Sequence, residues 1–93
     1  MNNYVSVTEW AGEWFLWNHR DADRMEYLRI NGFPHIVIIE TKMNREDFDS
    51  LVGPATTGLW TKTVEILGAS HFRVLAAFQN APDAIMARML VER

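Results

Sequence analysis

The sequence contains no cysteine, and proline and glycine are scarce, with three and five residues among 93. The missing cysteine excludes disulfides, thiolate zinc sites and a cysteine nucleophile. No large excess of either charge is present, and the net charge of −3 argues against the basic surface that binds nucleic acid. No apolar run approaches the roughly 20 residues of a membrane-spanning helix.

The composition that remains is that of a small folded domain. The apolar fraction of 48% supports a hydrophobic core, and the length suits one compact domain over residues 1–93. Residues 1–6 have neither the basic nor the apolar region of a secretory signal, so we expect a cytoplasmic protein. No motif indicates a cofactor or a metal ion, and none indicates an enzyme.

Turn residues and apolar patterns predict an α+β fold with the order β-β-α-β-α-(α)-β-α. We expect one four-stranded mixed sheet with helices mainly on one face, and a ferredoxin-like arrangement is a neighbouring alternative. The connection between the last two strands is long enough for a parallel crossover. The expected strands cover residues 4–10, 13–18, 35–41 and 71–79, and the expected helices begin near Asp23, Asn44, Gly58 and Asn80.

Five features support these assignments. Asp23 and Glu26 have the spacing of a capping box, and Asn31-Gly32 followed by Phe33-Pro34 predicts a helix end. The aliphatic run in 35–41 indicates a central strand covered on both faces. Trp60, Val64 and Leu67 have helical spacing within 58–67. The last helix is expected to bury a stripe of four residues, Ile85, Met86, Met89 and Leu90.

The N-terminal hairpin is the first candidate for function. A two-residue turn at Ala11-Gly12 places Tyr4, Trp10, Phe15 and Trp17 on one face, mixed with hydroxyl side chains, as protein interfaces often are. Three groups could pack against this face. They are the helices of the same chain, a second copy in a homodimer, or a different partner or ligand.

Histidines provide the second candidate. His35 opens one predicted strand and His71 opens another, so in parallel neighbouring strands the two imidazoles would meet at one end of the sheet. Glu40 would then lie at the opposite end, where α/β sheets prefer to bind ligands. Two histidines without a third ligand are weak evidence for a metal, and polar residues are also ordinary at strand starts.

The loop at residues 53–58 has two interpretations. Its glycine and threonine residues could cradle a phosphate at a helix start. However, Leu59-Trp60 stands where a phosphate-binding loop has lysine and a hydroxyl residue. A turn with Thr57 as a helix cap is the simpler interpretation.

Two functional hypotheses follow. The first is a small intracellular protein-interaction module, acting as a regulator, inhibitor or adaptor through the aromatic hairpin face. A phage-encoded regulator is one form of this hypothesis. The alternative is a small ligand-binding domain or enzyme that uses His35, His71 or Glu40 for acid–base chemistry.

Overall fold

The structure, a computed structural model, describes residues 3–6 and 20–92. Within them the chain forms a three-stranded antiparallel sheet with helices packed on it. The elements in chain order are α3 (Asp21–Ile30), β1 (His35–Thr41), α4 (Arg45–Val52), the 3-10 turn η1 (Gly53–Ala55), β2 (Trp60–Gly68), β3 (His71–Phe78) and α5 (Ala81–Val91).

The sheet has the strand order β1-β3-β2, so the expected four-stranded mixed sheet is wrong. β3 lies in the centre and pairs antiparallel with both neighbours, with His35 opposite Phe78 on β1 and Trp60 opposite Phe78 on β2. The expected parallel pairing of the last two strands is therefore also wrong. The predicted strands of the N-terminal hairpin fall mostly on residues 7–19, outside the described part. Of residues 3–6, Tyr4 forms one parallel bridge with Trp60.

Segment 58–67, expected as a helix, is in fact the strand β2 from Trp60 to Gly68. Its residues alternate in kind, with Trp60, Lys62 and Val64 on one face and threonines between them. Such alternation with β-branched residues suits a pleated strand. The spacing of the apolar residues in this segment is compatible with a helix as well as with a strand. The short turn at residues 69–70 then joins β2 to β3 as a hairpin.

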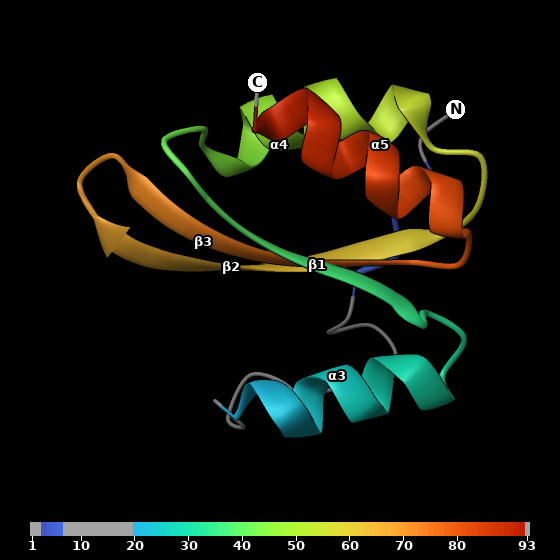
Figure 1. Ribbon diagram of the computed structural model, residues 1–93. Helices are drawn as coiled ribbons and strands as arrows, with labels where there is room; N and C mark the ends of the chain where they lie inside the picture. Colours follow the sequence, from blue (N-terminus) through green and yellow to red (C-terminus); the bar gives the residue numbers. More distant parts are fainter. Residues whose placement is uncertain (1–2, 7–19, 93) are drawn as a thin grey trace.

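Helices cover both faces of the sheet, which corrects the expectation that they pack mainly on one face. Figure 1 shows α4 and α5 above the sheet and α3 below it. The larger core lies on the α4 and α5 side, and Phe48, Trp60 and Phe78 are fully buried in it. The smaller core joins Leu28 of α3 to Leu75 and Ala77 of β3. The alternating side chains of β3 therefore contribute to both cores.

β1 has the predicted bounds, His35–Thr41, but lies at the edge of the sheet rather than in its centre. Its run of aliphatic residues arises because both faces are covered. Val37 and Ile39 belong to the larger core, whereas Ile36 and Ile38 pack against the smaller one. Coverage of the faces and position within the sheet are separate properties, and an apolar run reports only the first.

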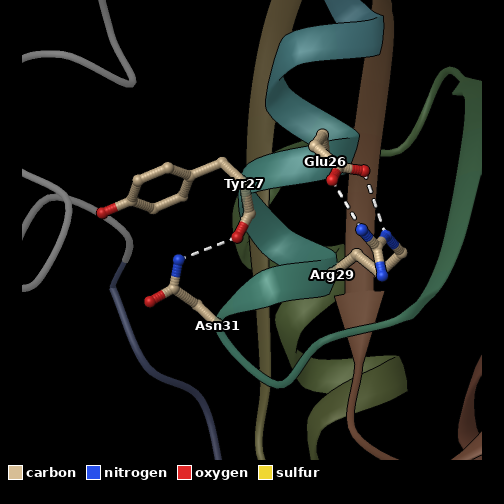
Figure 2. Close-up of polar contacts among 4 residues, drawn as sticks. All are labelled: Glu26, Tyr27, Arg29 and Asn31. Atoms are coloured by element: carbon tan, nitrogen blue, oxygen red, sulfur yellow. Dashed lines mark hydrogen bonds and ion pairs between the residues drawn. The ribbon is translucent and has the colours of Figure 1, made fainter.

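α3 begins at Asp21, not at the predicted capping box. Its N-cap is Arg20, which makes no side-chain capping bond, and Glu26 pairs with Arg29 instead of reaching back to the helix start. The predicted helix end is confirmed, because Gly32 has φ +95°, which favours glycine. The Asn31 side chain also donates to the Tyr27 carbonyl oxygen at 2.8 Å, as Figure 2 shows.

The other two helices begin as predicted. The Asn44 side chain accepts a hydrogen bond from the Asp47 amide at 2.8 Å and caps α4. α5 follows Asn80, with Pro82 in its first turn. Its predicted buried stripe is wrong, because Ile85 and Met89 are more than 60% exposed. The small Ala84 and Ala87 face the core instead and allow the helix to approach the sheet closely.

Candidate functional site

The two candidate histidines lie at opposite ends of the sheet, because their strands are antiparallel. His35 is opposite Phe78 at one end of β1, whereas His71 opens β3 at the other end. His71 lies beside Glu40, with 3.6 Å between its Nε2 and a Glu40 carboxylate oxygen. Both side chains of that pair are more than half exposed, so water competes for them. The expected meeting of the two imidazoles is therefore wrong.

A row of charges crosses the sheet beside that pair. Arg73 of β3 is opposite Glu40 on β1 and opposite Glu65 on β2. Its guanidinium also donates two bonds to Asp21 in the first turn of α3. The bonds to Asp21 raise the pKa of Arg73 above its ordinary value. Arg73 therefore ties α3 to the sheet, and the geometry accounts for it as a structural residue.

Lys62 is a deeply buried ionisable group that the sequence interpretation missed. Its side chain is 3% exposed, and its Nζ lies 2.7 Å from a carboxylate oxygen of Asp49 on α4. The Nζ also lies 4.4 Å from the centre of the Tyr4 ring and 5.7 Å from the Trp60 ring. Burial lowers the pKa of Lys62 below its ordinary value, and the neighbouring Asp49 opposes that shift.

Tyr4, predicted as a partner-binding residue, packs within this chain. Its ring meets the Trp60 ring edge-on at 5.0 Å between centres, and backbone bonds join Val5 and Asn3 to Trp60. The Tyr4 side chain also covers the Lys62 ammonium. These contacts enclose Lys62, so its lowered pKa reflects the core rather than a reactive site. The other predicted partner-binding residues, Trp10, Phe15 and Trp17, lie outside the described residues.

The loop at 53–58 holds no free cradle for a phosphate. The amides of Thr57 and Gly58 donate to one carboxylate oxygen of Asp83 at 2.9 and 3.0 Å. Asp83 itself is 2% exposed, and the Thr57 hydroxyl also bonds to it. A carboxylate of α5 therefore occupies the place where the phosphate was considered. Thr57 binds Asp83 and does not cap a helix.

An exposed apolar surface lies at the turn end of β2 and β3. We call it the hairpin-end groove. It is lined by Val64, Ile66 and Phe72 from the hairpin and by Asn44, Arg45 and Glu46 from the start of α4. In Figure 1 the hairpin formed by β2 and β3 extends past the adjacent end of α4.

The apolar side of the hairpin-end groove continues directly from the larger core. Val64 packs against that core, whereas Ile66 is 74% exposed and lies opposite Phe72 in the strand register. The neighbouring Leu67 is 42% exposed. Charged residues at the start of α4 border these apolar side chains, which is the composition of a small protein interface with a polar rim. The sequence interpretation missed this groove because it assigned residues 58–67 to a helix.

The described residues contain no candidate metal centre. Residues 3–6 and 20–92 contain no group of three or more histidine, aspartate or glutamate side chains that could hold a metal ion. None of the helices in that part of the chain is both long and apolar enough to cross a membrane. Comparison with family models, curated proteins and solved structures finds no match to this chain.

Proposed function

We propose that the protein is a protein-interaction module, acting as a regulator, inhibitor or adaptor. The observation that carries the proposal is the hairpin-end groove, where Ile66 is 74% exposed beside Val64 and Phe72. Single exposed aliphatic residues are common on protein surfaces. An apolar groove with charged residues along one side is better suited to receive a partner's side chain.

The partner that fits this groove is another protein presenting an aliphatic or aromatic side chain. The floor formed by Val64 and Phe72 provides the apolar contact. Arg45 and Glu46 offer one charge of each sign at the rim, and both are exposed. Such rim charges set the orientation and the association rate more than the affinity. The aromatic residues Trp10, Phe15 and Trp17 remain our proposed second contact, on the basis of the sequence alone.

The enzyme alternative has lost its main support. One form of it used His35 and His71 together at one end of the sheet, and they lie at opposite ends. The remaining pair, His71 and Glu40, is exposed to water. The Thr57 hydroxyl does contact a carboxylate, that of Asp83. That carboxylate is buried and also accepts from the amides of Thr57 and Gly58, so the contact holds the loop in place.

The test is a matched pair of surface substitutions, Ile66→Glu and Ile85→Glu. Both isoleucines are strongly exposed, at 74% and 62%, so each change alters stability by only about 0.5 kcal/mol. The native chain is used to capture partners from its source cells, and the affinity is then measured for each variant. We expect Ile66→Glu to weaken binding by about 30-fold, which is the loss of an interface contact worth about 2 kcal/mol.

The control on α5 makes the result specific. Ile85→Glu introduces the same charge at a similarly exposed isoleucine of α5 that does not line the hairpin-end groove. We expect this variant to bind like the native protein. Equal loss of binding in both variants would indicate a general effect of charge. Unchanged binding in Ile66→Glu would exclude the hairpin-end groove as the interface.

A further inference from the structure

The two edges of the sheet are built differently. The edge at β2 is occupied at its first residue, where the Val5 amide donates to the Trp60 carbonyl at 2.8 Å and the Trp60 amide donates to Asn3. The register of β2 is also interrupted between Ile66 and Gly68. Bulges and added strands are the usual means of preventing edge-to-edge pairing. β2 therefore carries two such protections.

The edge at β1 carries neither protection. Its seven residues pair with β3 in one uninterrupted register. In the part of the chain that the structure describes, no strand pairs with the outer side of β1, which runs along the front edge of the sheet in Figure 1. The strand contains no proline, lysine or arginine, and Ile36 and Ile38 are left half-buried. A regular apolar edge of this kind is a template for another strand.

We propose that β1 pairs antiparallel with β1 of a second copy of this chain, about a two-fold axis at Ile38. Side chains opposite each other in an antiparallel pair must lie on the same face of the sheet. A two-fold symmetric pair meets this condition only when the axis passes through a residue, not between two residues. The three strands of each copy then form one continuous sheet across the interface.

The sequence of β1 favours the register centred on Ile38. This register pairs the whole strand, with His35 opposite Thr41 and Ile36 opposite Glu40, so no two like charges are opposed. It also covers more of the partly buried Ile36 and Ile38. A shift of the centre to Val37 brings Pro34, which has no amide hydrogen, opposite Glu40. The pairing is separate from the hairpin-end groove, which lies on β2 and β3, so either proposal can fail alone.

Single cysteines test the register, because the native chain contains none. In the proposed dimer the two residues at position 38 face each other with Cα atoms about 4.5–5.5 Å apart, a separation that a disulfide can bridge. The two residues at position 40 are separated by four residue spacings, or about 13 Å. We therefore expect Ile38→Cys to form an intermolecular disulfide several-fold faster than Glu40→Cys under mild oxidation. Random collision predicts the reverse order, since Glu40 is the more exposed residue.

A mixing experiment gives a second readout that leaves Ile38 intact. Ile36→Cys and Glu40→Cys should each crosslink poorly alone, whereas an equal mixture should crosslink readily because Ile36 is opposite Glu40 in this register. Light scattering of the native chain should also show a mass approaching twice 10.8 kDa as the concentration rises from micromolar to millimolar. A monomer at every concentration, or crosslinking that follows exposure, would overturn the proposal. A foreign strand bound at β1 while the chain remains monomeric would overturn it as well.

Discussion

Lys62 is a structural residue with features that are also typical of a catalytic lysine. A buried lysine with a lowered pKa is typical of catalytic sites, but it also occurs in structural ion pairs. Here Asp49 and the Tyr4 ring enclose the ammonium. The sequence offered one signal for this arrangement, a lysine placed between two apolar residues that share its face in an alternating strand. Nothing in the sequence indicated that Asp49 would lie opposite it, because that contact joins two separate elements.

The Lys62–Asp49 pair predicts an asymmetric response to mutation. Asp49→Ala leaves an ammonium that is 3% exposed without its partner, and we expect a loss of about 3 kcal/mol in the free energy of unfolding. Lys62→Met keeps the aliphatic stem against Tyr4 and leaves a carboxylate that is 32% exposed, so the loss should be about 1 kcal/mol. Urea denaturation of both variants measures the difference. Equal losses would contradict the asymmetry.

The same lysine predicts a pH dependence of stability. The pKa of Lys62 is lowered in the folded state from its ordinary 10.5, so the unfolded state binds more protons between the folded pKa and 10.5. The free energy of unfolding should therefore gain a rising contribution with pH in that window. Below the folded pKa the cost of burying the charge is fully present. Lys62→Met should lack the rise, and an identical pH profile in both proteins would contradict the assignment.

A substitution at Thr61 is expected to increase stability rather than to reduce it. Its side chain is fully buried, and its hydroxyl has no hydrogen-bond partner within the described residues. Thr61→Val removes this unpaired hydroxyl at nearly constant shape in a strand that favours β-branched residues. We expect the free energy of unfolding to rise by about 1 kcal/mol, measured by urea denaturation. A loss of stability would contradict this prediction.

At the scale of elements, the sequence predicted several helix and strand ends correctly, but the capping box at Asp23 and Glu26 misplaced the start of α3. Asn44 capped α4, Gly32 ended α3, and β1 took its predicted bounds. The helix predicted over 58–67 is wrong because the spacing of its apolar residues fits both a helix and a strand. The pairing with β3 makes this segment a strand. The predicted buried stripe on α5 is wrong because the helix packs closely against the sheet through its small residues, Ala84 and Ala87. Local signals marked the helix ends at Asn44 and Gly32 but not the start of α3, and long-range packing decided the ambiguous interiors.

The connection from η1 into β2 is held by α5, and this contact predicts a clear loss of stability. Asp83 accepts bonds from Thr57 and Gly58, and a Cβ at Gly58 would lie 2.7 Å from the Asn80 side chain. Asp83→Ala should therefore cost about 2–3 kcal/mol in thermal or urea denaturation. Glu92→Ala is the control, since Glu92 pairs with Arg88 at the surface and should cost little. A small effect of Asp83→Ala would show that the loop holds its shape independently.

At the scale of the whole molecule, topology decides which candidate residues can act together. The sequence correctly indicated an α+β chain, but it contained no signal for the strand order β1-β3-β2. β1 and β3 are neighbours in that order, but their antiparallel direction separates His35 from His71 and places Glu40 beside His71. The topology also brought the end of the hairpin next to the start of α4 and so created the hairpin-end groove. A site assembled from several strands becomes visible only when their order is known.

The most direct test of the proposed function places a photo-crosslinking amino acid at position 66 or at position 85 of the full chain in its source cells. Both positions are exposed in the structure, so the probe is equally accessible at each. Our account predicts a distinct crosslinked partner protein from position 66, identified by mass spectrometry, and none from position 85. No partner at position 66, or the same partners at both positions, would contradict the assignment of the hairpin-end groove as the interaction surface.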